Sequence, residues 1–295
     1  MLEKFLQIQS PSPEHSFQPD WHNPADCRIW IKRDDLLHPV ISGNKWRKLK
    51  FALNDIQRQN VDHIISFGGG YSNHLHALGY CCHQLNIKLT AIVRGHYPVL
   101  TPMLRDLNNW GTQIEFVDKK NYQQRNDDEF LQSLNKRFPG AVIIPEGGSQ
   151  HQALAGITEC VNEFNRQYDY ILLPVASGAT MAGIINASPA GKSQVTGIAV
   201  LKGQDYLESL VNRFVDNNKQ TNWQINHQYH FGGYSKSPAE LQDFCQQITN
   251  KYNIPIEPVY SGKLFFALKS MLEQQSFGHK ANILVLHTGG IQGSR

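Results

Sequence analysis

The sequence predicts an α/β protein whose parallel sheets are covered by helices. Short apolar runs rich in valine and isoleucine alternate with segments of helical spacing along the 295-residue chain. Such alternation is typical of parallel strands joined by crossover helices. Several of the apolar runs end in glycine-rich sequence. Ligands of open α/β sheets collect at the carboxyl ends of strands, so we expect a site where these ends meet.

Each expected strand or helix follows from the spacing of its apolar residues. Compact Val/Ile-rich runs predict strands, in chain order, at IWIK around 30–32, then at 63–68, 89–95, 113–118, 141–148, 170–178, 195–200 and 282–290. Apolar residues spaced three or four apart predict helices at 44–59, 72–86, 151–168, 238–251 and 263–275. Four exits, FGGGYSN, PEGG, PVASGAT and LHTGG, point to one common crevice.

Composition excludes several classes of protein. Hydrophobic residues make up 40%, charged residues 18%, and the formal net charge is +3, as in an ordinary soluble globular protein. The sequence has neither the basic stripe nor the stacking motif that nucleic-acid-binding proteins have. Five cysteines without a CxxC pair argue against a disulfide framework and favour a reducing cytoplasm. The chain shows neither a cleavable apolar leader nor a run of about 18 apolar residues, so we expect neither secretion nor membrane insertion.

The stretch GNKWRKLK places Lys45 and Lys48 at the start of an expected helix. The helix dipole and a second ammonium both disfavour the charged form of Lys45, and a neutral amine can form a Schiff base with a carbonyl. Lys48 would then need an anion, and a phosphate would serve. The alternative is a capped amphipathic helix with exposed lysines.

A second stretch, PVASGATMAGI at 174–184, supports the phosphate. An apolar strand runs into small residues and then into a helix, where freed backbone N–H groups can cradle a phosphate. Such a loop can also be a plain tight turn, and it does not have Walker A spacing.

Five motifs in this order, SGNKWRKLK, FGGGYSNHLHALG, PVASGATMAG, EPVYSGK and LHTGG, resemble one family. It is the pyridoxal-phosphate-dependent family that contains 1-aminocyclopropane-1-carboxylate (ACC) deaminase and D-cysteine desulfhydrase. The resemblance runs from Ile29 to Gly293. It implies the tryptophan-synthase-β-like fold (fold type II), with pyridoxal 5'-phosphate between two open, twisted parallel-sheet domains. We expect a larger domain from 1–48 and 149–295, a smaller one from 49–148, and a homodimer.

The resemblance also implies roles for the lysines and the loop. Lys45 matches the Schiff-base lysine, and Lys48 and Asn44 match cofactor-binding positions. The phosphate-binding loop of the family matches the stretch Ser177, Gly178, Ala179 and Thr180 of this sequence. The family usually has a second glycine where this chain has Ala179, and an alanine there would be strained if the position requires positive φ.

Ser72 and Asn73 match a serine and an asparagine at a helix start. The resemblance associates the serine with the substrate carboxylate and the asparagine with the phenolic oxygen of the cofactor. A helix N-terminus suits a carboxylate, although ordinary N-capping explains both residue types equally well. His74 stands where the deaminases have glutamine, and we place it among the substrate-binding residues.

Two tyrosines complete the expected site. Tyr260, in EPVYSGK, matches a tyrosine that exchanges protons with substrate, and Tyr234, in FGGYSKSP, matches a second tyrosine over the site. For both, the alternative is a half-buried tyrosine with a satisfied hydroxyl.

Ser261 and Thr288 separate two branches of the family. ACC deaminases resembling this chain have glutamate and leucine at these positions, whereas the pair found here matches D-cysteine desulfhydrase. A glutamate beside the pyridine nitrogen would deepen the electron sink, whereas a serine only donates a hydrogen bond. We therefore expect a lyase that converts D-cysteine to pyruvate, ammonia and hydrogen sulfide by β-elimination, with Lys45 as base.

Three rivals stay open at this point. The protein could be an ACC deaminase or broader D-amino-acid deaminase, or a non-catalytic pyridoxal-phosphate-binding protein. A metal or redox site is a third reading, but its spacing is poor, and we expect no metal. Its candidate ligands are His74, His76, Cys81, Cys82 and His83.

Overall fold

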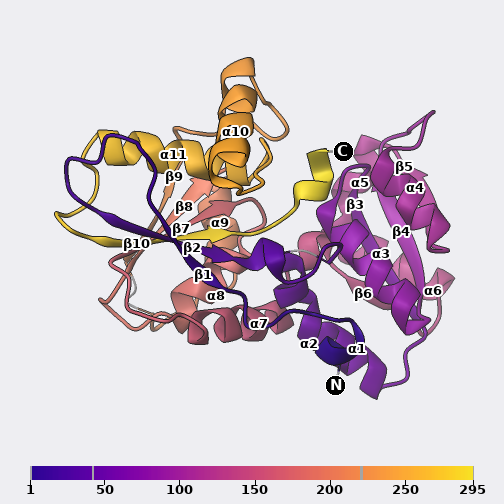
Figure 1. Ribbon diagram of the computed structural model, residues 1–295. Helices are drawn as coiled ribbons and strands as arrows, with labels where there is room; N and C mark the ends of the chain where they lie inside the picture. The colour runs from indigo at the N-terminus through magenta and orange to yellow at the C-terminus, as the bar shows by residue number, and fades with distance from the viewer. Residues whose placement is uncertain (1, 42, 220–221, 295) are drawn as a thin grey trace.

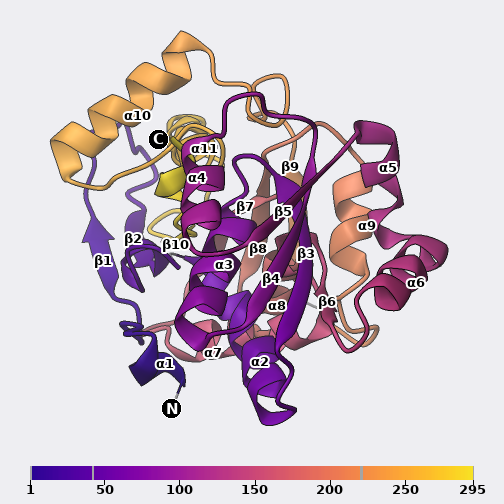
Figure 2. The same ribbon diagram turned by 90° about the vertical axis from the view of Figure 1, so that its right-hand side faces the viewer.

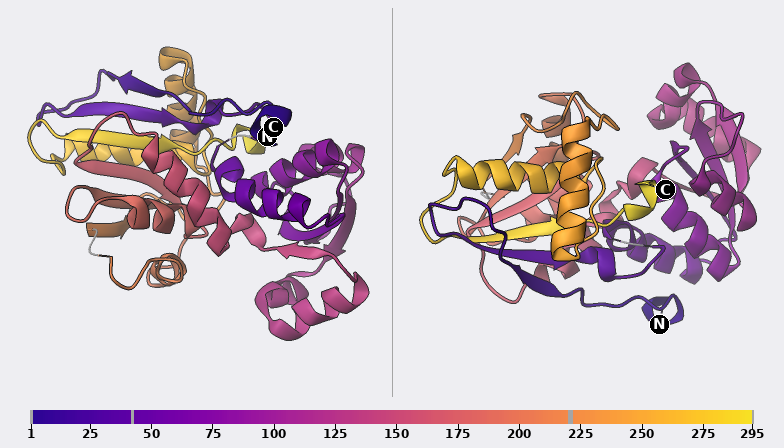
Figure 3. Two further views of the ribbon diagram at one scale, coloured as in Figure 1. Left: turned by 90° about the horizontal axis from the view of Figure 1, so that it is seen from below. Right: turned by 45° about the horizontal axis from the view of Figure 1, so that its top comes forward.

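The computed structural model describes residues 2–41, 43–219 and 222–294. Two sheets form two bodies side by side, the six-stranded one to the left and the four-stranded one to the right in Figure 1. The two bodies also stay distinct when seen from below and when the top is turned 45° toward the viewer (Figure 3). Short helices that belong to neither helix layer include α1 (Leu2–Phe5), η1 (Asp34–Leu36) and η4 (Ile291–Ser294).

The six-stranded sheet has the order β1-β2-β10-β7-β8-β9. Its strands are β1 (Glu14–Phe17), β2 (Arg28–Arg33), β7 (Tyr170–Val175), β8 (Gln194–Ala199), β9 (Asn222–Asn226) and β10 (Asn282–His287). All neighbours pair in parallel except β1, which is antiparallel to β2. The helices of this body are α7 (His151–Asn162), α8 (Ala179–Ala187), α9 (Tyr206–Asn212), α10 (Ala239–Tyr252) and α11 (Ser261–Glu273).

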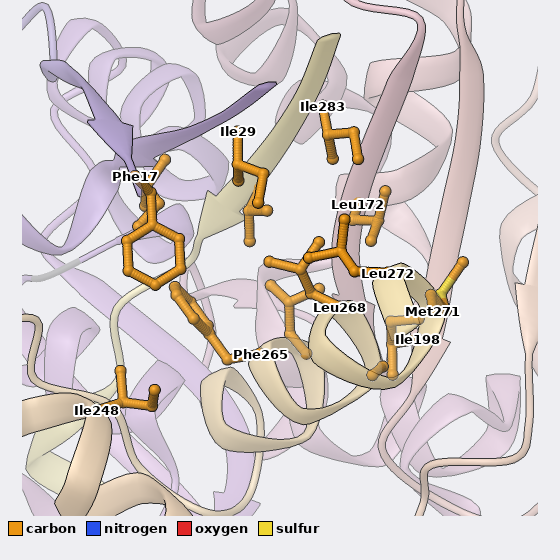
Figure 4. Packing of buried hydrophobic residues seen from close by; sticks show 14 of the residues in the cluster. Phe17, Ile29, Leu172, Ile198, Ile248, Phe265, Leu268, Met271, Leu272 and Ile283 are labelled. Atoms are coloured by element: carbon orange, nitrogen blue, oxygen red, sulfur yellow. The ribbon is translucent and has the colours of Figure 1, made fainter. Parts of the chain in front are cut away.

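Both faces of this sheet are apolar, as expected of a parallel sheet between helix layers. Successive residues of β10 point to opposite faces: Ile283 and Val285 pack in one core cluster, and Leu284 and Leu286 in the other. The first cluster includes Phe265 and Leu268 of α11 and is shown in Figure 4.

The four-stranded sheet has the order β5-β4-β3-β6 and is parallel throughout. It comprises β3 (His63–Gly69), β4 (Lys88–Arg94), β5 (Gln113–Val117) and β6 (Val142–Ile144). Helices α3 (Asn73–Leu85) and α4 (Pro102–Asn109) cover one face, and α5 (Lys119–Gln123) and α6 (Asp128–Arg137) the other (Figure 2). Two short 3-10 turns, η2 (Gln124–Asn126) and η3 (Glu146–Gly148), follow α5 and β6.

Helix α2 (Asn44–Arg58) connects the two bodies. Its apolar residues Trp46 and Leu49 lie in the core cluster beneath the four-stranded sheet. At the same time its buried Arg47 donates to Asp34 at 3.0 Å and to Glu163 at 2.7 Å, and both carboxylates belong to segments of the six-stranded body. A buried cation with two carboxylate partners resists displacement, because losing either one would leave an unpaired charge.

The architecture confirms the predicted fold class. Every expected strand and helix exists, although the strand expected at 141–148 covers only Val142–Ile144 and the helix expected at 151–168 ends at Asn162. The elements β1, β9, α4, α5, α6 and α9 were not expected. All strands of the smaller sheet lie within 49–148, but α2 runs through the expected boundary at 48/49, so the domain limits stay a prediction. Among the described helices, none is both long and apolar enough to cross a bilayer.

Candidate active site

The four glycine-rich strand exits meet between the two sheets. A methyl group on Gly290, after β10, would lie 2.6 Å from Nδ2 of Asn73, after β3. A methyl group on Gly147, after β6, would lie 3.3 Å from Oγ of Ser177, after β7. Strand ends far apart in the sequence are therefore neighbours, as the glycine pattern predicts.

The start of α2 places Lys45 in this region. Gly43 has φ +71° and packs so closely on the carbonyl of Thr288 that a Cβ would lie 1.6 Å from the oxygen, and Asn44 N donates to the same carbonyl at 3.1 Å. The Asn44 amide donates to Thr180 Oγ1 at 3.0 Å and accepts from Lys45 Nζ at 3.1 Å. Asn44 thus orients the amine.

Lys45 is half-buried, and the protein packed around its amine lowers its pKa from 10.5 to about 8. Burial is the cause here, rather than the helix dipole or the neighbouring ammonium that the sequence suggested. The lysine pair acts instead on Lys48, whose pKa lies well below its usual range through burial and the charge of Lys45. Within the described ranges, neither amine contacts a carboxylate.

Lys48 is completely enclosed and donates only to hydroxyls. Its Nζ lies 3.0 Å from Ser149 Oγ and 3.2 Å from Ser177 Oγ, and the two hydroxyls lie 2.7 Å apart. We call these three residues the Lys48 triangle. A buried ammonium without a counter-charge is costly, so the triangle has the character of a site for an anion.

The loop between β7 and α8 lies against the Lys48 triangle. Gly178 takes φ +82°, and a Cβ there would lie 2.6 Å from the backbone of Leu210, so glycine is required. Ala179 is the first residue of α8 and does not have positive φ, so the missing second glycine causes no strain. The first N–H groups of α8, from Ala179 onward, have no partner within the helix.

Ser72 and Asn73 begin α3. The hydroxyl of Ser72 accepts from Leu75 N at 3.2 Å, so the serine does cap the helix. Asn73 differs, because its Oδ1 is buried without a hydrogen-bond partner among the described residues. The first turn of α3 therefore offers free N–H groups beside an amide that can still bind a ligand.

His74 is buried with one ring nitrogen unpaired. Ser66 Oγ donates its only proton to Ile144 O at 2.7 Å, so the 2.8 Å contact with His74 is a bond donated by Nε2 of the ring. This leaves Nδ1 as an acceptor, and it has no partner among the described residues. Burial and the charges of Lys45 and Lys48 hold the pKa of His74 well below its usual range, so the ring is neutral.

Tyr234 and Tyr260 also meet, as expected. Their hydroxyls lie 3.0 Å apart and their rings pack edge to face. The pKa of Tyr260 lies well above its usual range, because of burial, the adjacent Tyr234 hydroxyl and the charge of Glu257. At neutral pH Tyr260 is therefore a proton donor.

Ser261 and Thr288 are both buried. Ser261 Oγ accepts from Glu257 N at 2.9 Å and lies 3.1 Å from the Glu257 carboxylate, so its proton is directed to Glu257. Thr288 uses its carbonyl to hold the start of α2. Ser261 is fully enclosed, so a group that contacts its hydroxyl must displace neighbouring atoms.

A family model described as "Pyridoxal-phosphate dependent enzyme" matches residues 19–289. The chain belongs to this family. It is 28% identical, over 98% of its length and 78% of the relative, to the mitochondrial bifunctional D-cysteine desulfhydrase/1-aminocyclopropane-1-carboxylate deaminase of Arabidopsis thaliana. The solved structure of an ACC deaminase homologue matches with a TM-score of 0.79 at 24% identity, covering 99% of this chain and 95% of that one.

A hydrogen sulfide-producing enzyme from Fusobacterium nucleatum also shares the fold, with a TM-score of 0.68 at 12% identity and 99% coverage of both chains. The comparisons confirm the resemblance drawn from the motifs, the fold-type II architecture and the cofactor. This protein is an enzyme that uses pyridoxal 5'-phosphate.

The residues present fit that cofactor. An aldehyde requires an amine that is often neutral, which Lys45 supplies. A phosphate requires a cation and hydroxyls, which the Lys48 triangle supplies beside the start of α8. Polar ring substituents require free partners, which the unpaired Asn73 Oδ1 supplies.

Two neighbours of the site were missed from sequence. Ser149 follows the PEGG exit, which was recognised as glycine-rich, but no side chain of that exit was assigned. Glu257 stands inside the EPVYSGK motif, but the motif assigns it no role.

His76, a candidate metal ligand together with His74, contacts Asp106 instead. Among the described residues, no three His, Cys, Asp or Glu side chains could hold a metal ion.

Proposed function

We propose that the protein eliminates the β-substituent of a small D-amino acid, with D-cysteine as the leading substrate and pyruvate, ammonia and hydrogen sulfide as products. The observation that carries the proposal is the half-buried Lys45 amine, with a pKa of about 8, near the ends of four strands. An amine that exchanges its proton near neutral pH can act both as nucleophile and as base.

The cofactor, when bound, supplies an aldehyde for an amine and a ring that withdraws electrons from the substrate α-carbon. Lys45 would hold the cofactor through its amine, and its Nζ, when free, would take the proton from the substrate α-carbon. Asn44 keeps Nζ in place through its hydrogen bond of 3.1 Å. The Lys48 triangle, Gly178, Ala179 and Thr180 hold the phosphate.

The first turn of α3 holds the substrate carboxylate. Ser72 and the free N–H groups at the helix start favour an anion there. Asn73 holds the phenolic oxygen of the cofactor with its unpaired amide. His74, neutral and with Nδ1 as an acceptor, receives a hydrogen bond from a donor on the substrate or cofactor.

Tyr260 delivers a proton to the departing group. Its raised pKa keeps the hydroxyl protonated, and the Tyr234 hydroxyl at 3.0 Å fixes its direction. A thiolate is a good leaving group and needs little proton donation. For cysteine, the position of the Tyr260 hydroxyl therefore matters more than its acidity.

The choice between the two reactions rests on Ser261 and Thr288. ACC has no α-proton, and opening its ring needs stronger electron withdrawal than β-elimination does. Neither residue carries the carboxylate that would supply it, which favours D-cysteine. ACC deamination is the second candidate, since one relative is named for both activities. The preference for a D-substrate rests on the family resemblance.

A product-resolved assay tests the proposal. Purified protein saturated with pyridoxal 5'-phosphate is incubated separately with D-cysteine, L-cysteine, D-serine and ACC, and sulfide, pyruvate and 2-oxobutanoate are quantified. We expect sulfide and pyruvate in equal amounts from D-cysteine and no 2-oxobutanoate from ACC. Release of 2-oxobutanoate without sulfide would replace the proposal by ACC deamination.

We also propose a homodimer in the cytoplasm. The dimer is supported by the family resemblance, and the compartment by the cysteine pattern. Light scattering coupled to size-exclusion chromatography measures the mass of the assembly against the 33.5 kDa of one chain.

A further inference from the structure

The turn that joins β3 to α3 runs from Gly69 to Ser72. Ser72 N donates to Gly69 O at 3.1 Å, which closes the turn. Ser72 is the last residue before the helix, and its hydroxyl caps the first helical turn. The conformation of this short turn therefore decides where the Ser72 hydroxyl and the first N–H groups of α3 point.

Two side chains from the stretch between β4 and α4 hold Gly70, inside this turn, by both of its backbone groups. Gly70 N donates to the hydroxyl of Tyr97 at 2.9 Å, and Gly70 O accepts from the hydroxyl of Thr101. Gly70 and Thr101 are buried, and Tyr97 is half-buried. We call Tyr97 and Thr101 the Gly70 clamp.

The turn is packed so closely on both sides that glycine is required. A Cβ at Gly70 would lie 2.5 Å from Cζ of the Tyr97 ring. A Cβ at Gly68 would lie 2.6 Å from Oγ of Ser72. The glycines of FGGGYSN therefore let the tyrosine ring and the serine hydroxyl approach the backbone, which fixes the position of both.

The Gly70 clamp is itself anchored in the four-stranded body. The Tyr97 ring packs against Phe116 of β5, with the ring centroids 5.9 Å apart. The Thr101 hydroxyl also accepts from Leu104 N at 3.2 Å, so it caps α4. Val99, between the two, is 79% exposed. Tyr97 and Thr101 thus point inward from a segment whose tip is open to solvent.

We propose that Tyr97 and Thr101 are positioning residues for the substrate carboxylate: they hold the turn so that the Ser72 hydroxyl and the first N–H groups of α3 are aimed at one anion. The inference rests on the proposed function, which places that carboxylate at the start of α3. Donors that are fixed before the ligand arrives bind it more tightly, because less freedom is lost on binding. Loss of the clamp should therefore weaken the hold on the carboxylate and spare the rest of the substrate.

The experiment compares two ligands of the full chain saturated with cofactor. Alanine carries a carboxylate, and alaninol carries an alcohol in its place. Both enantiomers are titrated, and the hand that the parent protein binds is used for the comparison. The dissociation constant is obtained from the change in the visible absorption spectrum of the bound cofactor. Tyr97→Phe removes the hydroxyl and keeps the ring.

We expect Tyr97→Phe to weaken alanine binding by about 3-fold to 10-fold, the range for one neutral hydrogen bond, and to leave alaninol binding unchanged. Tyr170→Phe is the matched control. The Tyr170 hydroxyl also accepts from a glycine N–H, that of Gly278 at 3.2 Å, but Tyr170 begins β7, at the end of the strand away from the site. This control should change neither constant.

Thr101 provides a second test of the same idea. Thr101→Val removes the hydroxyl at nearly constant size, and Thr101→Ser keeps a hydroxyl. We expect the selective loss of alanine binding in the valine variant and recovery in the serine variant. A serine variant as weak as the valine variant would remove Thr101 from the clamp.

Equal losses for alanine and alaninol in Tyr97→Phe would reduce Tyr97 to a support of the fold and overturn the inference, and so would the absence of any loss. Neither ligand has a β-substituent to eliminate, so these outcomes do not depend on which substrate is turned over. Failure of the D-cysteine assay together with a selective loss of alanine binding would reject the proposed reaction and leave the Gly70 clamp standing.

Discussion

The amine of Lys45 donates a hydrogen bond of 3.1 Å to Oδ1 of Asn44, the residue that precedes it in the chain. Adjacent residues on a helix point in different directions, so this contact folds the lysine back over the first turn of α2. Asn44 is in turn held by Thr180 at 3.0 Å. The position of the amine is thus set by α8 as well as by its own helix.

Lys45→Ala should abolish the visible absorption band of protein-bound pyridoxal 5'-phosphate, because no amine remains to bind it covalently. Reduction with borohydride followed by peptide mass spectrometry checks the site of attachment. Lys50→Ala is the control, since Lys50 lies on the same helix but pairs with Glu159. An unchanged band in Lys45→Ala would contradict the assignment.

The rate of covalent cofactor attachment to the apoprotein should rise with pH, reach half of its maximum near pH 8 and level off at higher pH. Only the neutral amine attacks an aldehyde, and the pKa of Lys45 is about 8, so half of the amine is neutral at that pH. An ordinary lysine would give a rate that still rises toward pH 10. Stopped-flow absorbance over this range decides between the two curves.

Lys48→Met should weaken pyridoxal 5'-phosphate binding by about 10-fold to 100-fold, the range for loss of a charge-assisted hydrogen bond. Binding of pyridoxal, which lacks the phosphate, should change far less. Isothermal titration of both compounds measures the difference. Equal losses for the two compounds would mean that Lys48 does not serve the phosphate.

Ser261→Glu combined with Thr288→Leu should gain ACC deamination and lose D-cysteine turnover. The new carboxylate must enter a fully buried position beside Glu257, so we expect a stability loss of about 1–3 kcal/mol from overpacking alone. Thr288→Leu alone should keep D-cysteine activity. Persistent D-cysteine turnover without any ACC product in the double variant would remove the basis for the branch choice.

Gly43→Ala should destabilise the protein by at least about 2 kcal/mol, because a Cβ at this position would lie 1.6 Å from Thr288 O. Gly140→Ala is the matched control: it has φ +81° but no atom within 4 Å of the added carbon. Comparing urea denaturation of both variants separates the cost of positive φ from the cost of the clash.

Strands buried on both faces were predictable, because their Val/Ile runs stand out from neighbouring sequence. The edge strands β1 and β9 read EHSF and NWQIN, and half of an edge strand faces solvent, so they lack that signal. Helices α5 and α6 lie in a polar stretch at 119–137, where burial of a few residues such as Tyr122 and Leu134 decides the structure.

The residues of the candidate site likewise fall into those that the sequence predicts and those that it does not. Residues inside a recognisable motif, such as Lys45 and Ser72, could be named from sequence. Ser149 could not, because its role depends on a contact with Lys48 across 101 positions. The state of the Ser261 proton and the tautomer of His74 likewise depend on neighbours that only the fold brings together.

Helix α2 has its apolar side in the core of one body, and its first N–H, that of Asn44, donates to the carbonyl of Thr288, just after the last strand of the other body. Rotating the two bodies against each other would bend this helix or break the hydrogen bond between Asn44 and Thr288. The reactive amine therefore stays with the strand end during any such motion.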